Sequence, residues 1–183
     1  VVTLKVCPIY QKVAHLLEDC PYSADKCPPP TDKYLNSRLH IFTFWEPRNS
    51  VPPYVQLCMK TWKKFIPNAE IHVLDYSNMA DYADVKGVYG ERLFSGSFTL
   101  PMIADAIRAL ILEQHGGIWM DADTILTGGK IEEYLHTEKE VSFWGYPQQP
   151  GVHLAWISAK KHAKLLQHWV SQCAQKINTL AKA

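Results

Sequence analysis

The sequence has no long apolar run and no large excess of charge of either sign, and these absences exclude several kinds of function. No stretch of the 183 residues reaches the ~18 to 20 consecutive apolar residues that a membrane-spanning helix needs. The formal net charge is +1, so the charge balance gives no reason to expect nucleic-acid or bulk membrane binding. The N-terminal residues lack a basic leader followed by an apolar block, so no secretory signal is visible. We therefore predict a cytoplasmic protein, either free or peripheral at the inner face of the membrane.

The cysteines do not form a recognisable metal motif. There are five of them, and none lies in a C-x-x-C pair, which argues against a cysteine zinc site. Reduced, partly buried thiols are the favoured interpretation. A disulfide among Cys7, Cys20 and Cys27 is the alternative, and it would imply an oxidising compartment.

The composition is that of one globular domain preceded by a short extension. Hydrophobic residues make up 47% and charged residues 20% of the chain. Residues 1–37 are predicted to be a helical extension, with its helix at 9–20, followed by a proline-rich linker at 27–34. Residues 38–183 are predicted to form the main domain.

Strand and helix patterns alternate through residues 38–183, which predicts an α/β fold with a parallel βαβ unit. The expected strands are 38–45, 70–75, 118–121, 140–146 and 153–159, and the expected helices are 54–67, 100–117 and 160–177. Residues 76–100 show no clear periodicity and are predicted to be a mobile or active-site segment.

Two carboxylates follow the short apolar run in "GGIWMDADTIL" (116–126). Because residues i and i+2 of a strand point to the same side, Asp121 and Asp123 are expected to converge where the strand ends. Two close carboxylates stay ionised only beside a cation, and oxygen ligands of this kind favour Mg²⁺ or Mn²⁺. The pair predicts a metal that binds a phosphate or diphosphate, and the alternative is two solvated turn acids.

The helix before this run carries Asp105 and Arg108 on one otherwise apolar face. Charges in a mostly buried helix are costly unless they are paired or used. The pair is either structural, or Asp105 accepts a sugar hydroxyl while Arg108 bridges to a phosphate or to the carboxylates.

The combination "MIADAIRALILEQHGGIWMDADTIL" (102–126) resembles the signature of GT-A fold glycosyltransferases of the capsular polysaccharide synthesis type, which carry a DXD sugar-binding region. The upstream segment 41–75 is similar too, with Thr61 and Trp62 in the family's pattern. The resemblance implies a Rossmann-like, nucleotide-sugar-binding mixed sheet flanked by helices. The family usually continues past the closing helix, so this sequence is expected to be a compact member or to lack a C-terminal portion.

The resemblance also implies a reaction and a set of site residues. A hexose-type sugar would pass from a nucleotide sugar, most often a UDP-sugar, to a saccharide or lipid-linked saccharide, in capsular or other surface polysaccharide synthesis. Mn²⁺ or Mg²⁺ bound by Asp121 and Asp123, the expected catalytic residues, would neutralise the leaving diphosphate. The expected donor-binding residues are Phe44, Trp45, Asp105, Arg108 and Ala122. His153 and Trp156 are further candidates for sugar contacts, although a lone His or Trp on a strand is more often a core residue.

Two rival interpretations remain open at this stage. In a haloacid dehalogenase-type phosphohydrolase, Asp121 would be the nucleophile and Asp123 the acid/base, with Ser158 and Lys160 assisting. No Asp or Glu follows Ser158, so the final metal-binding acids of that family are missing. The second rival is a nucleotide-sugar-binding domain without turnover.

Overall fold

A computed structural model of the chain describes residues 39–128, 139–144 and 152–179. The predicted helix at 9–20, the linker and three of the five cysteines lie outside these ranges. The N-terminal extension therefore stays a prediction. Cys58 and Cys173 both carry free thiols.

A five-stranded mixed sheet lies at the centre of the fold, in the order β2-β1-β3-β5-β4. The strands are β1 (His40–Phe44), β2 (Glu70–Leu74), β3 (Gly117–Met120), β4 (Val141–Trp144) and β5 (His153–Ala159). β1 pairs in parallel with β2 and with β3, whereas β5 is antiparallel to its neighbours β3 and β4. The predicted α/β class is confirmed, and each expected strand is present.

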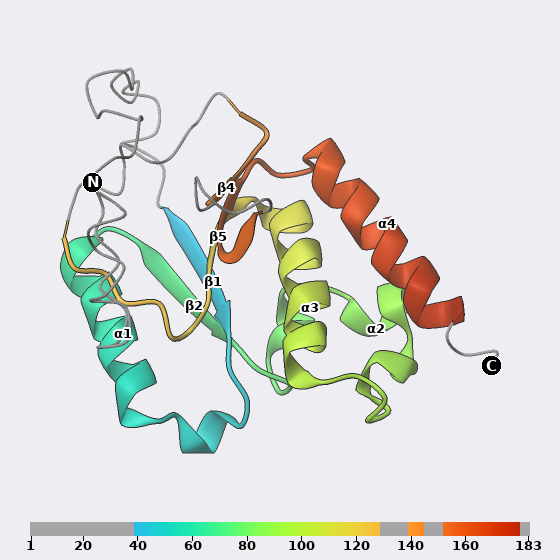
Figure 1. Cartoon of the computed structure of the whole chain (residues 1–183), viewed down its shortest axis with the longest axis horizontal. Coiled ribbons are helices and arrows are strands. Elements are labelled where there is room, and N and C mark those ends of the chain that lie inside the picture. Colours follow the sequence, from blue (N-terminus) through green and yellow to red (C-terminus); the bar gives the residue numbers. More distant parts are fainter. Residues whose placement is uncertain (1–38, 129–138, 145–151, 180–183) are drawn as a thin grey trace.

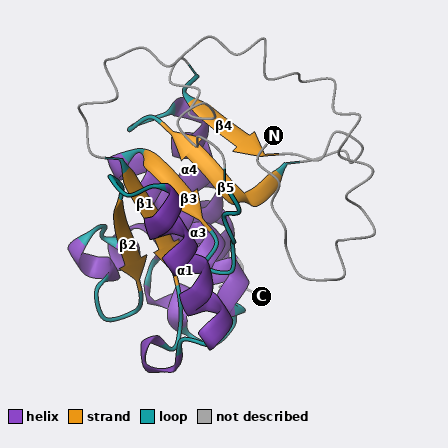
Figure 2. Cartoon of the chain, turned by 90° about the vertical axis from the view of Figure 1, so that its left-hand side faces the viewer, coloured by secondary structure: helices purple, strands orange, loops and turns teal. Residues whose placement is uncertain are grey.

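Helices cover both faces of this sheet (Figures 1 and 2). α1 (Pro53–Phe65) packs on one face, and α3 (Leu100–His115) packs on the other, where α2 (Val85–Tyr89) and α4 (Lys164–Thr179) complete the layer. The strands alternate between two cores accordingly. Ile41 of β1 joins the core under α1, and its neighbour Phe42 joins the core under α3. None of the helices in the described ranges is long and apolar enough to cross a membrane.

Two glycines make the tight connection from α3 to β3. Gly116 ends the helix at a positive φ of 68°, and Gly117 follows with φ 96°. A Cβ on Gly116 would lie 2.6 Å from the backbone nitrogen of Lys161, and one on Gly117 would lie 2.7 Å from the carbonyl oxygen of His40. Both positions therefore need glycine for backbone conformation and for close approach.

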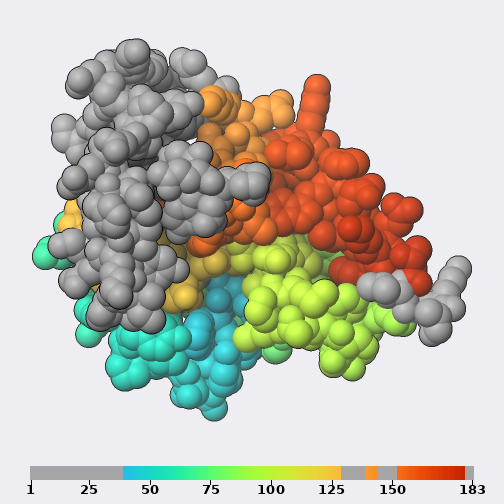
Figure 3. Space-filling view, viewed as in Figure 1, coloured from blue at the N-terminus to red at the C-terminus, as the bar shows by residue number. Residues whose placement is uncertain are grey.

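Residues 76–100 are more ordered than their pattern suggested. They contain η6 (Met79–Asp81), α2 and η7 (Glu91–Phe94), and they bury Tyr89, whose hydroxyl donates to the Ala106 carbonyl at 3.0 Å. These elements are too short to show a helical period in the sequence. α2 and η7 pack against α4, whose red surface in Figure 3 is continuous with the green surface of this segment.

Candidate functional site

The candidate site lies at the carboxyl ends of β1 and β3. The chain leaves β1 toward β2 on one side and later adds β3 on the other, so the strand order reverses between β1 and β3. Crevices at such a reversal, outside the carboxyl ends of the strands, are where open α/β sheets bind ligands. Phe42 pairs with Trp119, so continuing that register by two residues brings the end of β1 level with Asp121.

Asp121 is held in a defined orientation directly after β3. Its Oδ1 accepts a hydrogen bond from the Trp119 indole at 2.9 Å and lies 3.1 Å from an Arg108 nitrogen. Its backbone nitrogen donates to the Ala155 carbonyl of β5 at 2.9 Å. Trp119 faces the core under α3, and the alternation of β3 puts Asp121 on that same side, which is why a residue of α3 reaches it.

Arg108 is the most deeply buried charge of the site, with 6% of its side chain exposed. The guanidinium bridges Asp105, at 3.0 Å, and Asp121, and it donates to the Leu154 carbonyl of β5. It also lies over the Trp119 ring, 5.2 Å from the ring centroid. Its Nε is buried without an acceptor among the described residues. Arg108 thus connects α3, β3 and β5 at one point.

Asp105 is destabilised as a carboxylate by its surroundings. Burial raises the pKa of Asp105, the charge of Arg108 partly opposes this shift, and the nearby charge of Asp121 adds to it. Its side chain is nevertheless 43% exposed, and that of Asp121 is 34% exposed. Both carboxylates are therefore fixed by Arg108 and still reachable by a ligand.

Asp123 does not lie on the strand, which differs from the expectation for the pair. β3 ends at Met120, and the Thr124 nitrogen donates to the Asp121 carbonyl at 2.9 Å, so Asp121–Thr124 is a turn. The two-residue alternation of a strand does not apply within a turn, so the strand argument does not hold for this pair, and the convergence of the two carboxylates stays a prediction. Asp123 is exposed and makes no hydrogen bond or ion pair with a described residue, while its charge adds to burial in raising the pKa of the Cys58 thiol of α1.

Two residues of α1 anchor the segment that follows the acids. The Trp62 indole donates to the Thr124 carbonyl at 2.6 Å, and the Leu126 nitrogen donates to the Thr61 hydroxyl at 2.9 Å. Trp62 is completely buried. The family resemblance drew attention to Thr61 and Trp62 in the sequence. In the structure, their hydrogen bonds hold the backbone that follows Asp123.

The remaining predicted donor-site residues divide into buried and accessible ones. Phe44 and Ala122 are buried, and Phe44 packs against the Tyr76 ring with centroids 5.6 Å apart, so neither side chain is offered to a ligand. Trp156 is buried in the core under α1, which corrects its candidacy for a sugar contact. Trp45 is half-buried, and its indole nitrogen has no partner among the described residues, whereas His153 is exposed.

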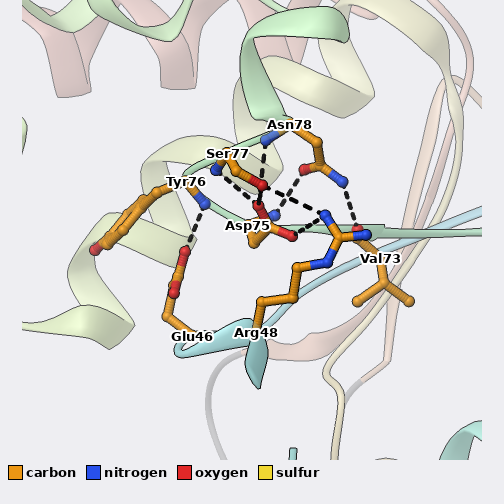
Figure 4. A network of polar contacts seen from close by, with 7 residues as sticks. All are labelled: Glu46, Arg48, Val73, Asp75, Tyr76, Ser77 and Asn78. Carbon is orange, nitrogen blue, oxygen red and sulfur yellow. Dashed lines mark hydrogen bonds and ion pairs between the residues drawn. The ribbon is translucent and has the colours of Figure 1, made fainter. Parts of the chain in front are cut away.

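Sequence reasoning missed an open hollow beside these strand ends. It measures about 610 Å³ and is lined by residues 46–49 after β1 and 75–77 after β2. Its floor is a hydrogen-bonded turn centred on Asp75, drawn in Figure 4. Arg48 donates to Asp75 at 2.8 Å, the Ser77 nitrogen donates to it at 2.7 Å, and Tyr76 exposes its ring at the rim. The pattern Asp-Tyr-Ser-Asn is a turn signal that could have located this floor.

Burial alone would raise the pKa of Asp75, but the hydrogen bonds from Ser77 and Asn78 and the charge of Arg48 outweigh it and hold that pKa below its usual range. Asp75 is therefore ionised, and its charge is already used within the turn. The backbone nitrogen of Tyr76, in the same turn, donates a hydrogen bond to the Glu46 carboxylate at 2.5 Å, which connects the segment after β2 to the segment after β1. The two segments that line the hollow are thus joined by hydrogen bonds.

The phosphohydrolase interpretation is wrong in its placement of the assisting residues. Ser158 pairs with Ile118, three residues before Asp121 and roughly 10 Å away along β3. Lys160 follows β5 beside the start of β3, because β5 is antiparallel. Neither residue can therefore reach a phosphate bound at Asp121.

A family model described as "Capsular polysaccharide synthesis protein" matches residues 15–176. Two curated relatives are the O-glycosyltransferase PaGT of Phomopsis amygdali, 25% identical over 157 residues, and the O-glycosyltransferase braB of Annulohypoxylon truncatum, 24% identical over 157 residues. These alignments cover 76% and 74% of this chain, and the chain spans only 38% and 37% of the relatives' lengths.

The fold is also similar to that of a solved structure, the PaToxG glycosyltransferase. The TM-score is 0.57 at 17% sequence identity, and the match covers 95% of this chain and 72% of the other. At this identity the likeness establishes the fold, a mixed sheet flanked by helices, and leaves activity to be argued from the site.

Proposed function

Since the chain belongs to the capsular polysaccharide synthesis protein family, we propose that it is a metal-dependent glycosyltransferase that uses a nucleotide-sugar donor. The observation that carries this proposal is the buried Arg108, held between Asp105 and Asp121 at the strand-order reversal. A buried cation that orients two reachable carboxylates is suited to positioning a polar ligand such as a sugar.

The described residues fit a divalent cation of the Mn²⁺ or Mg²⁺ kind. Asp121 contacts the described Trp119 and Arg108 side chains through Oδ1, and Asp123 is exposed, so carboxylate oxygens remain available to a hard ion that keeps several waters. Three carboxylates and one guanidinium leave a formal charge of −2 when Asp105 is ionised, which a divalent ion neutralises. When bound there, such an ion would stabilise the charge that develops on a leaving diphosphate. Arg108 would orient Asp121, and Asp105 would accept a donor-sugar hydroxyl.

The hollow after β1 and β2 supports a place for the nucleotide. It lies at the same edge of the sheet as Asp121, and the exposed Tyr76 ring offers a surface on which a base can stack. The half-buried Trp45 directly precedes Glu46, the first residue that lines the hollow. We propose a UDP-sugar with a hexose-type sugar as the donor.

The acceptor is proposed to be a hydroxyl group. Two relatives carry the name O-glycosyltransferase, which supports transfer to oxygen. The family description supports a saccharide or lipid-linked saccharide in surface polysaccharide synthesis. Because the chain spans less than two fifths of those relatives, an acceptor-binding part outside this sequence is compatible with the proposal.

Calorimetric titration of UDP with and without Mn²⁺ tests the proposal. Mn²⁺ is expected to raise the affinity of the wild-type chain for UDP at least tenfold, which corresponds to about 1.4 kcal/mol. Asp123→Asn should remove this gain, because it removes one charge from the metal site and leaves the turn hydrogen bond of Asp121 intact. Asp81→Asn is the matched control, since Asp81 is exposed in η6 and should leave the gain unchanged.

UDP binding that responds neither to Mn²⁺ nor to Asp123→Asn would overturn the metal assignment. A turnover assay then separates the enzyme from a binding domain. Release of UDP from a UDP-sugar, by transfer or by slow donor hydrolysis, supports the transferase. Tight metal-dependent binding without either reaction would favour the nucleotide-sugar-binding domain instead.

A further inference from the structure

Three metal-binding side chains converge at the opposite edge of the sheet from the candidate site. His40 begins β1, and Glu70 and His72 lie on β2. One ligand atom from each residue lies within 4.8 Å of the others. From these contacts we propose a second metal site, a zinc site formed by His40, Glu70 and His72, which clamps the amino ends of β1 and β2.

The parallel register explains why these residues meet. His40 pairs directly with Glu70, and Phe42 pairs with His72. Glu70 and His72 are two residues apart on one strand, so they share a face of the sheet, and His40 lies beside them on the same face. The site is distinct from the Asp121 region, because His40 lies roughly 13 Å along β1 from Phe44.

The nitrogen atoms are nearly at the separation that zinc needs. His40 Nδ1 and His72 Nε2 are 3.0 Å apart. Two Zn–N bonds of the usual length that meet at a tetrahedral angle would place the nitrogens about 3.3 Å apart. A change of a few tenths of an ångström at the exposed His40 ring converts the present contact into two bonds to one ion. Glu70 supplies an oxygen, and the fourth position remains open to water.

The second coordination layer is already in place around His72. Its Nδ1 lies 3.2 Å from the Tyr82 hydroxyl, and the Tyr82 carbonyl lies 2.7 Å from His115 Nε2. When Nδ1 donates to the Tyr82 oxygen, Nε2 presents its lone pair toward His40. The His72 ring also stacks on Phe42, with centroids 4.8 Å apart. Metal-binding histidines characteristically have their other nitrogen fixed by such a partner.

The donor set favours zinc over the ions expected at the aspartates. Two imidazole nitrogens and one carboxylate suit Zn²⁺, whereas Mn²⁺ and Mg²⁺ prefer sets made of oxygen alone. Glu70 and His72 belong to β2, which is an edge strand among the described strands of the sheet. An ion bound there therefore cross-links the edge strand to its neighbour and stabilises the folded chain by mass action.

A competition titration with a chromophoric zinc chelator tests this site on the full chain after removal of any affinity tag. The wild-type chain is expected to bind one equivalent of Zn²⁺ that His40→Gln and Glu70→Gln bind at least tenfold more weakly. Tyr82→Phe should weaken the same equivalent about tenfold, because Tyr82 acts on the metal only by orienting His72. His168→Gln, at an exposed position of α4, is the matched control and should bind zinc as the wild type does.

Two further measurements distinguish zinc bound at this site from zinc bound elsewhere on the chain. Co²⁺ substituted for the same equivalent should show no thiolate charge-transfer absorption, which excludes the cysteines. Asp123→Asn should still bind one equivalent of Zn²⁺ as the wild type does. His40→Gln should still show the increase in UDP affinity with Mn²⁺. Failure of one proposal therefore does not imply failure of the other. Thermal unfolding of the metal-free variants verifies that they are folded. Equal zinc uptake by the wild type, His40→Gln and Glu70→Gln would overturn the proposal.

Discussion

Replacement of Arg108 by methionine would remove the cation that links α3, β3 and β5 while keeping an unbranched apolar chain in its place. The side chain is 6% exposed and contacts Asp105, Asp121, the Leu154 carbonyl and the Trp119 ring. Each of these contacts would be lost in Arg108→Met. The buried Nε of Arg108, which lacks an acceptor among the described residues, would be lost too, and its removal offsets a small part of the cost.

The expected loss of stability depends on the surroundings that each partner of Arg108 has after the substitution. The Leu154 carbonyl is part-buried, so the loss of its donor costs less than the upper end of the about 1 to 3 kcal/mol for a fully buried group, and the contact with the Trp119 ring contributes about 0.5 to 2 kcal/mol. The carboxylates of Asp105 and Asp121 are 43% and 34% exposed, so water replaces much of what they lose, and each pair contributes about 0 to 1 kcal/mol. We expect a loss of about 2 to 4 kcal/mol, near the lower end of the roughly 3 to 5 kcal/mol for breaking a fully buried pair.

Urea unfolding followed by circular dichroism measures this loss in the free energy of unfolding directly. The midpoint of thermal unfolding should fall by roughly 4 to 16 °C. Arg108→Lys should lose less stability, because it retains the charge and gives up the two-pronged geometry. Lys86→Met breaks an exposed pair with Glu91 and is the matched control, with an expected cost below about 1 kcal/mol. A loss for Arg108→Met no larger than that of Lys86→Met would refute the structural role assigned to Arg108.

Two further predictions concern single carboxylates. Asp105→Ala should weaken binding of the UDP-sugar more than binding of UDP, because the proposed contact is to the sugar, and equal losses in paired calorimetric titrations would indicate a structural role instead. Asp75→Asn should cost about 2 kcal/mol of stability at pH 7, because the ionised group accepts hydrogen bonds from Arg48 and Ser77. Its folded pKa is lowered, so this difference should be complete above the unfolded value near 3.9 and should shrink as the pH falls through the folded value. Urea unfolding at pH 7, 5 and 3 measures it, and a difference that grows toward acid pH would contradict the assignment.

Most of the secondary structure could be predicted because it depends on local patterns. The apolar, β-prone run around Ile41 and the apolar residues of α3 are each visible within a few positions of the sequence, and Gly116 ends the helix in a backbone conformation that other residues rarely adopt. Residues 76–100 escaped prediction because their helices are shorter than the window over which a period is visible. They become helical through packing on α3 and α4, which the local sequence does not encode.

The candidate site shows more clearly the difference between what local sequence determines and what tertiary packing determines. The sequence by itself determined that Asp105 and Arg108 share a helical face and that acids follow β3. Only the tertiary structure decided that Arg108 reaches Asp121 and that a turn separates Asp121 from Asp123.

The contacts between distant segments have one physical origin. Trp62 meets Thr124, and His40 meets His72, because strand register and helix packing bring together residues that are tens of positions apart. Periodicity reports which face of an element is buried, since that depends on the residue's own neighbours in the chain. It carries no information on which residue of another element lies opposite, because that is set by the packing of the whole core.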